Sequence, residues 1–331
     1  MTPPAVRTPE PTTQDAVLRA ASEALRTLAE DRRLRDRFHR HPELRGFLRP
    51  GAFRYIVAAD LRGALAYCAR LADTGYRIGL EAAREEATTD AEVAAVVTDH
   101  HALVECLWAW PSAPVQLGVD LANVGLLRDM DAAVAHTGGI ADRAAHIGST
   151  VMLSMDRSTF TDRVLTAYAR IRPGRANVGI TLQARLLRTP DDLAEIPRHS
   201  LLRLVRGGHA EGPDAALPRG ERLDRRYVEL ARAALDRDLH LTVAAHDARL
   251  LEALDAEGVL DRVREIEMPH GVQPALLSRY RAAGRPCRVA CVYGDNWWPY
   301  FLHRLAEHPP SALAVLADLA AGRTLAAPEY T

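Results

Sequence analysis

The chain of 331 residues contains no lysine, and all 42 of its basic side chains are arginine. This absence excludes chemistry that needs a lysine amine, including Schiff-base aldolases and pyridoxal-phosphate enzymes. It also excludes a lysine-dependent phosphate loop, and no glycine-rich loop of that spacing occurs. Basic and acidic residues nearly cancel, at 42 against 43. We therefore expect neither nucleic acid nor an anionic membrane surface as a partner.

Cysteine pairs and long apolar runs are also lacking. The four cysteines are Cys68, Cys106, Cys287 and Cys291, and none of them forms a C-x-x-C pair. This pattern argues against disulfides and zinc, and it indicates a reducing cytoplasm. No stretch approaches the ~20 apolar residues of a membrane span, so we expect a soluble, cytoplasmic protein.

Composition divides the chain into four parts. Residues 1–14 are rich in proline and threonine and lack an apolar run, which predicts a loose tail and no signal peptide. Residues 15–72 form a predicted helical segment. Residues 73–321 form a longer α/β region, and residues 322–331 a second tail. One large domain with a helical extension accounts for these lengths.

The helical segment shows apolar residues at helical spacing. They predict one helix over residues 15–37 and another over residues 61–71. Pro42 and Pro50 interrupt the first part, and Gly75 ends the second helix.

The α/β region alternates short apolar runs with helices. Its eight strand candidates are residues 76–81, 114–121, 151–155, 177–183, 201–205, 239–245, 263–268 and 287–292. Predicted helices include residues 223–235, 248–257 and 274–283, one that a Thr89–Glu92 capping box starts, and one that starts at Thr189. This alternation predicts a (βα)₈ barrel with an N-terminal helical extension. A doubly wound sheet is the alternative, but it would need a glycine-rich turn after the first strand, where residues 81–84 read EAAR.

Polar residues stand where the predicted strands end, at the mouth where barrel enzymes place their sites. They are Glu81, Asp120, Ser154, Gln183, Arg206, His246, Glu267 and Tyr293. Five side chains in this region leave a metal-dependent hydrolytic site as an open alternative, namely His246 with Asp247, Glu81 with Asp120, and His270. No ligand spacing is diagnostic of such a site, and single histidines commonly have structural roles.

After the last strand, Tyr300, His303, Arg304 and Glu307 share one face of a predicted helix. A guanidinium beside an aromatic ring can receive a small carboxylate through two hydrogen bonds. The alternative is a packing helix with a surface pair between Arg304 and Glu307.

Four segments in order resemble the motifs of the proline dehydrogenase family. They are residues 177–190 (NVGITLQARLLRTP), 202–209 (LRLVRGGH), 243–247 (VAAHD) and 293–308 (YGDNWWPYFLHRLAEH). The resemblance runs from about residue 61 to residue 316. It implies an FAD-binding (βα)₈ barrel that oxidises proline to pyrroline-5-carboxylate.

The resemblance implies a nearly complete set of cofactor-binding residues. Gln183 matches the glutamine that hydrogen-bonds the isoalloxazine, and Arg203 matches the arginine near the flavin's reactive N5 edge. Arg206-Gly207 stands where the family has Lys-Gly beside the phosphates, and His246 matches the histidine after strand six. Donors close to the flavin ring tune its electronics.

The substrate side departs from the family pattern. Tyr300, Arg304 and Glu307 are retained, but the first arginine of the family's carboxylate clamp is His303. The family lysine after strand two is Asp120, and the aspartate after strand three is Ser154. Two family tyrosines are His209 and Ala290, and a leucine after strand seven is Pro269. The lysine-to-aspartate change reverses the sign of charge beside the substrate, and losing two rings opens space.

We therefore predict an FAD-dependent dehydrogenase or oxidase that moves a hydride from a carbon next to nitrogen to flavin N5, giving an imine. The expected substrate is an amine or amino acid other than free proline, including a carrier-bound one, in secondary metabolism. Arg203, Asp120 and His303 are the predicted catalytic residues, with Asp120 or His303 as amine ligand or base. The electron acceptor would be a quinone, dioxygen or a partner protein. An ordinary proline dehydrogenase and a catalytically silent binding barrel are the alternatives.

Overall fold

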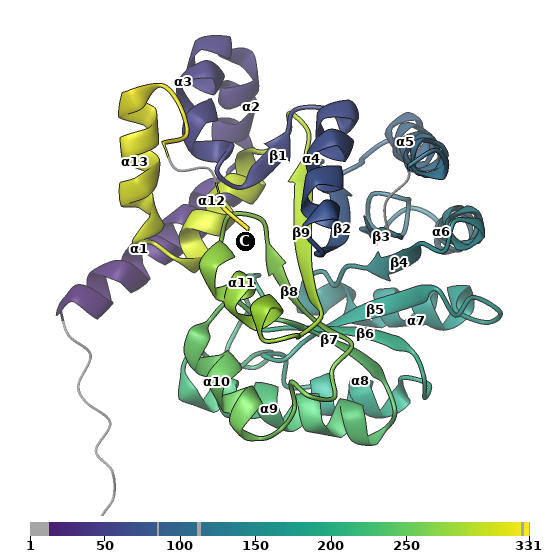
Figure 1. Cartoon of the computed structure of the whole chain (residues 1–331). Coiled ribbons are helices and arrows are strands. Elements are labelled where there is room, and N and C mark those ends of the chain that lie inside the picture. Colours follow the sequence, from purple (N-terminus) through teal and green to yellow (C-terminus); the bar gives the residue numbers. More distant parts are fainter. Residues whose placement is uncertain (1–12, 85, 111–113, 326–327, 331) are drawn as a thin grey trace, which may run out of the picture. The chain divides into compact units, whose positions relative to one another are not determined.

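Eight parallel strands close into a barrel in the computed structural model, which describes residues 13–84, 86–110, 114–325 and 328–330. Each of these strands pairs with the next in the chain, and the last of the eight also pairs with the first, which closes the barrel (Figure 1). The strands are β2 (Arg77–Ala82), β3 (Gln116–Val119), β4 (Thr150–Leu153), β5 (Val178–Gln183), β6 (Leu201–Val205), β7 (His240–Ala244), β8 (Glu265–Pro269) and β9 (Cys287–Tyr293). All eight strands predicted from the sequence are therefore confirmed.

A ninth strand, β1 (Ile56–Ala58), was not expected from the sequence. It pairs with Val292 and Tyr293 in β9, beyond Ala290, the last β9 residue that pairs with β8. Three residues are too few to show the alternation that marks a strand. Only pairing with β9 makes this segment a strand.

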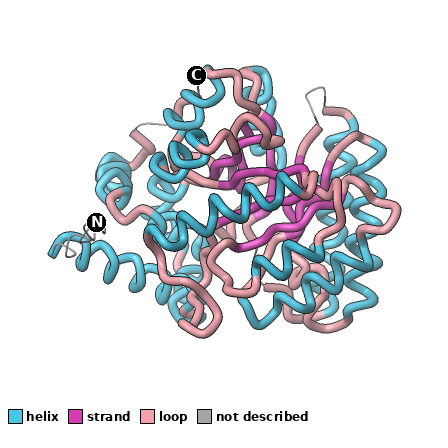
Figure 2. The backbone as a smooth tube through the Cα atoms, turned by 90° about the horizontal axis from the view of Figure 1, so that it is seen from below, coloured by secondary structure: helices cyan, strands magenta, loops and turns pink. Residues whose placement is uncertain are grey.

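Helices surround the barrel on its outer side, and Figure 2 shows the strands gathered inside them. They are α4 (Leu61–Asp73), α5 (Asp90–Trp108), α6 (Met130–His146), α7 (Thr161–Ile171), α8 (Thr189–Glu195), α9 (Glu221–Asp236), α10 (Ala248–Ala256) and α11 (Pro274–Ala282), with a short 3₁₀ turn at Ser158–Phe160. The predicted capping box starts α5, because Thr89 Oγ1 accepts from Glu92 N and Glu92 Oε2 accepts from Thr89 N. Gly75 follows α4 with a φ of +88°, as its predicted role at the helix end requires.

The apolar core lies between the strands and the surrounding helices. Outward-facing strand residues such as Leu80, Leu117 and Leu153 are at most 1% exposed. Because side chains alternate along a strand, the residues between them face the barrel interior. In this barrel several of those interior positions carry charge, and they build the site described below.

A second set of helices forms a separate compact unit, made of residues 13–52 and 298–325 among those described. Its helices are α1 (Thr13–Glu30), α2 (Arg32–Arg40), α3 (Pro42–Ala52), α12 (Trp298–Glu307) and α13 (Ser311–Ala321). Within this unit the ring of Phe38 packs against that of Trp298 at 4.9 Å. Gly51 in α3 lies so near Val315 in α13 that a Cβ there would stand 2.5 Å from Val315 Cγ1.

The predicted single helix over residues 15–37 is wrong in one respect. Asp31 ends the first helix and caps a second, accepting hydrogen bonds from Arg33 N and Leu34 N at 2.8 and 3.1 Å. An aspartate in mid-pattern competes for backbone donors in this way. The predicted break at Pro50 is also wrong, because Pro50 lies inside α3. Residues 1–12 of the predicted N-terminal tail lie outside the described residues.

The division into units differs from the boundaries expected at residues 72 and 321. Residues 298–325 group with the N-terminal helices, while residues 53–72 group with the barrel. Tyr330, in the predicted C-terminal tail, also belongs to the barrel unit. Its hydroxyl accepts from Gly271 N at 3.0 Å and lies 3.2 Å from His270 Nδ1. Among the described helices, none has the length and apolar composition needed to cross a membrane.

Candidate active site

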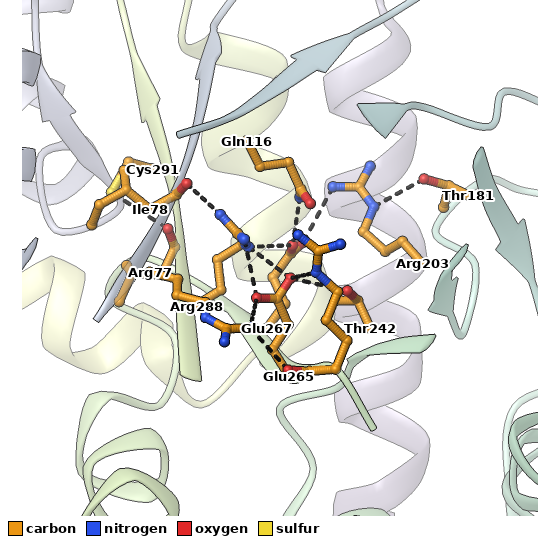
Figure 3. A network of polar contacts seen from close by, with 12 residues as sticks. Arg77, Ile78, Gln116, Thr181, Arg203, Thr242, Glu265, Glu267, Arg288 and Cys291 are labelled. Carbon is orange, nitrogen blue, oxygen red and sulfur yellow. Dashed lines mark hydrogen bonds and ion pairs between the residues drawn. The ribbon is translucent and has the colours of Figure 1, made fainter. Parts of the chain in front are cut away.

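Charged and polar side chains of several strands meet inside the barrel in one network, which Figure 3 shows from close by. The lower of two layers is a buried ion pair between Glu265 in β8 and Arg288 in β9. Arg288 Nε and Nη2 donate to the two carboxylate oxygens at 2.9 and 3.0 Å. Arg77 Nη1 and Thr242 Oγ1 each donate to the same carboxylate at 3.0 Å. Burial acts to raise the pKa of Glu265, but Arg288 and Arg77 together hold it below its usual value.

The upper layer joins Glu267 to Arg203. Glu267 Oε1 accepts from Arg203 Nη1 at 3.2 Å, and Oε2 accepts from Gln116 Nε2 at 2.9 Å. Arg203 Nε donates to Thr181 Oγ1 at 2.9 Å, and Nη2 donates to Ser154 Oγ at 3.5 Å. Acceptors from β5, β8 and the end of β4 therefore hold the guanidinium in one orientation. The charge of Arg203 is compensated by Glu267.

Gln183, the last residue of β5, has a buried side-chain oxygen to which no described residue donates a hydrogen bond. Its side chain is 2% exposed, and Nε2 donates to the carbonyl of Asp156 at 2.7 Å. Oε1 has no hydrogen-bond partner among the described residues. A buried oxygen left in this state costs about 1–3 kcal/mol. A hydrogen-bond donor on a bound ligand would satisfy it.

Gly207, two residues after the end of β6, passes close to this amide. Its φ is +104°, and a Cβ would stand 2.7 Å from Gln183 Oε1 and 2.8 Å from Arg185 Cδ. The left-handed backbone and the close contact both favour glycine. Only glycine therefore lets the backbone pass this close to the buried amide of Gln183.

Replacing Gly207 with alanine is expected to destabilise the protein by about 1–3 kcal/mol, because the new methyl group strains the backbone and meets Gln183. The matched control is Gly208→Ala. No described atom lies within 4 Å of the position its Cβ would take, so the change should stay within about 0.5 kcal/mol. Urea unfolding measures the free energy of unfolding of both variants. Equal losses of stability would contradict the specific need for glycine at residue 207.

Arg206 lies between two carboxylates on the same side of the mouth. Its Nη2 is 2.7 Å from Asp224 Oδ1, and its Nη1 is 3.1 Å from Asp247 Oδ2. Burial acts to raise the pKa of Asp247, but Arg206 holds it below its usual value. Arg219 Nη2 donates to the carbonyl of Gly207 at 3.1 Å. A phosphate at this position would compete with two aspartates for Arg206.

The opposite side of the mouth is acidic. Asp120, which follows β3, accepts from Ala122 N at 2.9 Å and lies 3.4 Å from Asn123 Nδ2. Although part of the residue stays exposed, burial together with the carboxylates of Asp156 and Glu81 raises the pKa of its carboxyl to about 7. No ion pair joins Asp120 to another described residue. The group is a desolvated acid with neutral hydrogen-bond partners.

The remaining predicted substrate residues of the barrel lie around these groups. His209 Nε2 is 3.9 Å from Asp156 Oδ1. Ser154 contacts Arg203, as described above. Ala290 is two residues beyond Arg288 in β9, so it faces the interior nearer the mouth, where it pairs with Gly79 and Pro269. Small side chains therefore border the charged layers on this side. His246 follows β7 immediately before Asp247.

The predicted residues of α12 belong to the helical unit and meet one another there. Arg304 Nη2 is 2.7 Å from Glu307 Oε1, and its guanidinium carbon lies 5.0 Å from the ring centroid of Tyr300. The prediction that these side chains share one helix face is confirmed. His303 precedes Arg304 on the same helix. Their placement beside a cofactor stays a prediction.

Sequence reasoning identified the strand-end residues but missed the network beneath them. Glu265, Arg288, Gln116, Thr181 and Thr242 were not singled out. A signal was present, since Glu265, Glu267 and Arg288 interrupt otherwise apolar strands at alternate positions. Alternation shows that such residues share a face, but it does not show which strand supplies the partner. Among the described residues, no group of three or more histidines, cysteines and acids is placed to hold a metal ion.

The chain is similar to bacterial proline dehydrogenases. It is 25% identical to proline dehydrogenase 1 of Bacillus subtilis over 276 residues, which is 82% of this chain and 91% of that protein. It is 26% identical to proline dehydrogenase of Deinococcus radiodurans over 281 residues, which is 82% of this chain and 90% of that protein. No family model matches the chain.

Solved structures of proline utilization A have a similar fold. The protein of Bdellovibrio bacteriovorus, inactivated by N-propargylglycine, matches with a TM-score of 0.70 at 14% identity over 97% of this chain. A variant of the Bradyrhizobium japonicum protein matches with a TM-score of 0.65 at 16% identity over 96% of this chain. This chain spans 43% of the length of both. The predicted barrel fold and the resemblance to proline dehydrogenase are confirmed, and with them the proline dehydrogenase-like class of enzyme.

Proposed function

We propose that the protein is a flavoenzyme that oxidises a C–N bond to an imine, and that its substrate is an amine or amino acid other than free proline. The observation that carries the choice of substrate is Asp120. A desolvated acid stands where the resemblance implies a lysine, and the carboxylates of Asp156 and Glu81 act on it from neighbouring strands. Ser154 in place of an aspartate completes the change, because it removes an anion that a clamp arginine would need.

The barrel mouth fits FAD on two observations of this chain. Gln183 presents a buried acceptor that has no donor among the described residues, and Gly207 places no side chain against it. Gln183 and Arg203 would lie against the isoalloxazine, and Arg206, Gly207 and His246 would line the rest of the cofactor. Arg206 would exchange one aspartate partner for a phosphate, which a guanidinium fork can bind as well as a lysine does.

When bound, FAD accepts the hydride that leaves the carbon next to nitrogen. Arg203 would hold its guanidinium at the reacting edge, with Thr181 and Glu267 fixing the orientation. Such preorganised charge needs no reorganisation during the reaction. Asp120 or His303 would bind the substrate amine and take its proton, since hydride leaves more readily from a neutral amine.

The substrate would lie between the flavin and the residues that depart from the family pattern. Tyr300 and Arg304 would contact it, with Glu307 orienting Arg304 at 2.7 Å. Ser154, His209 and Ala290 would leave more room than the larger side chains implied by the resemblance. This space suits a larger or modified substrate, including an amino acid on a carrier, in secondary metabolism. A quinone, dioxygen or a partner protein would reoxidise the flavin, in the cytoplasm.

A purified sample is expected to carry flavin absorbance bands and to release FAD on denaturation. Replacing Gln183 with leucine should lower the flavin content at least about tenfold, because it removes the donor and acceptor beside the ring. Gln273→Leu, which changes a glutamine at the start of α11, is the control and should keep full flavin content. Mass spectrometry and the visible spectrum give both values. A colourless protein that takes up no added FAD would refute the proposal.

Oxidation of free L-proline is a second candidate. It is favoured by Arg304, which keeps a guanidinium between Tyr300 and Glu307. This candidate requires that L-proline bleach the flavin anaerobically at least as fast as any other amine. Loss of one charge-assisted hydrogen bond from a two-arginine clamp would cost about 1.5–3 kcal/mol of binding.

A further inference from the structure

We propose that Asp120 binds the protonated nitrogen of the substrate and accepts its proton, and that the substrate class is cationic amines whose carboxyl group is absent or masked. This inference rests on the proposed function and names the substrate of the same site. It assigns one role to Asp120, where His303 was the alternative.

The charge of the mouth supports a cationic ligand. Glu81 is the last but one residue of β2, and Asp120 and Asp156 follow the neighbouring strands β3 and β4. Both Glu81 and Asp156 act on the Asp120 carboxyl. The oxygen Oε2 of Glu81 would lie 2.6 Å from a Cβ at Gly118, so this glycine leaves room for that carboxylate. A substrate carboxylate would be repelled here, whereas an ammonium would be attracted.

Three arginines that border the mouth have carboxylate partners other than Asp120. Arg203 is paired with Glu267 at 3.2 Å, and Arg84 with Asp99 at 2.8 Å. Arg206 lies between two aspartates. Asp120 itself has only a backbone N–H and an amide as hydrogen-bond donors among the described residues. A buried carboxylate gains most from a cation that can reach it, and the substrate is that cation.

A second observation independently indicates that this mouth holds a ligand. Gln183 is 2% exposed, and its Oε1 lacks a partner among the described residues. The Nε2 atom of the same side chain donates to the backbone carbonyl of Asp156 at 2.7 Å. The amide of Gln183 therefore contacts one of the three residues that make this side of the mouth acidic.

The proton balance of the step is complete. Asp120 takes one proton from the ammonium, which leaves a neutral amine. The carbon next to nitrogen then loses a hydride with its two electrons to the flavin of the proposed function, and the C–N bond becomes a double bond. Burial raises the pKa of Asp120 to about 7, with Asp156, Glu81 and Glu86 adding to the effect, so the group can accept a proton near neutral pH.

The test uses three ligands with the same five-membered ring, namely pyrrolidine, L-prolinamide and L-proline, on the flavin-loaded full chain. Calorimetry should show that pyrrolidine and L-prolinamide bind at least about tenfold more tightly than L-proline at pH 8. Asp120→Asn should weaken pyrrolidine at least about tenfold, and Asp120→Lys should reverse the order in favour of L-proline. Asp191→Asn, an exposed aspartate in α8, is the control and should change neither value.

The expected dependence on pH distinguishes a binding residue from a structural one. Affinity for pyrrolidine should rise as pH increases through about 7, where Asp120 ionises, and this step should vanish in Asp120→Asn. Unchanged pyrrolidine affinity in that variant, or tighter binding of L-proline by the unaltered protein, would overturn the inference. Binding is read separately from flavin bleaching. Failure of every amine to bleach the flavin would refute the proposed oxidation and leave the binding result standing.

The Asp120→Asn variant is also expected to fold. Because the folded protein raises the pKa of Asp120, the stability that its protonated form contributes is lost as pH rises from about 4 to about 7. Asparagine avoids that loss. The melting temperature of the variant should therefore exceed that of the unaltered protein by about 2–5 °C at pH 8 and match it at pH 4.

Discussion

Replacing Arg203 with methionine is expected to lower kcat/KM for the best amine substrate by about 10²–10³-fold. Methionine keeps a long, flexible side chain but removes the charge and every hydrogen-bond donor of the guanidinium. Groups that stabilise charge in a transition state have effects of this size when they are removed. Thr181 and Ser154 would lose a partner, while Glu267 would keep Gln116 as a donor and Arg288 at 3.9 Å. The flavin content should stay above about half, because Gln183 is untouched.

Glu267→Gln is the matched control for Arg203→Met. Glutamine can still accept from Arg203 and retains the shape of the side chain, so the rate should fall by only about tenfold. The guanidinium would, however, lose its compensating charge. An uncompensated cation beside the flavin favours its reduced, more negative form, so the reduction potential should shift to a more positive value.

Potentiometry and anaerobic flavin reduction check both variants. An Arg203→Met protein that keeps its flavin and reacts within threefold of the original rate would show that the guanidinium has no part in the reaction. An unchanged potential in Glu267→Gln would show that Glu267 serves only packing.

Replacing Arg288 with methionine is expected to cost about 3–5 kcal/mol of stability. The carboxylate of Glu265 is buried, at 0% exposure, and it would lose the two hydrogen bonds that Arg288 donates. Among the described residues, only Arg77 and Thr242 would still donate to it. Glu267 loses a neighbouring cation at the same time. Urea unfolding followed by circular dichroism measures the loss.

Two controls separate the buried charge from the loss of packing. The double variant Arg288→Met with Glu265→Gln removes the stranded charge and should recover at least half of the lost stability. Arg232→Met breaks the ion pair between Arg232 and Glu257, whose side chains are 58% and 50% exposed, and should cost less than about 1 kcal/mol. If the double variant were as unstable as Arg288→Met, packing and not charge would explain the effect.

The local sequence was sufficient for the elements of the barrel. Short apolar runs such as residues 177–183 and 201–205 became β5 and β6, because parallel strands covered by helices need apolar side chains. The capping box at Thr89 and the glycine at residue 75 marked real helix ends, since their hydrogen bonds and backbone angles involve only neighbours in the chain. Where local signals compete, prediction failed: Asp31 divides a helical pattern that looked continuous.

Interior contacts depended on the closed barrel. Glu265 and Arg288 are 23 residues apart and Glu267 and Arg203 are 64 apart, and only adjacent or facing strands bring them together. The same holds for β1, which is a strand because β9 lies beside it. It also holds for Tyr330, whose hydroxyl accepts a hydrogen bond from Gly271 in the loop that follows β8.

The sequence by itself determined a barrel of eight strands, its resemblance to proline dehydrogenase, and polar residues at the strand ends, with Asp120 among them. Only the tertiary structure decided that Arg203 is compensated, that Gln183 keeps an unfilled acceptor, and that Asp120 is desolvated among other acids. The physical reason is that periodicity reports which face a side chain occupies. Its pKa and its partners depend on charges that distant strands bring within a few ångströms.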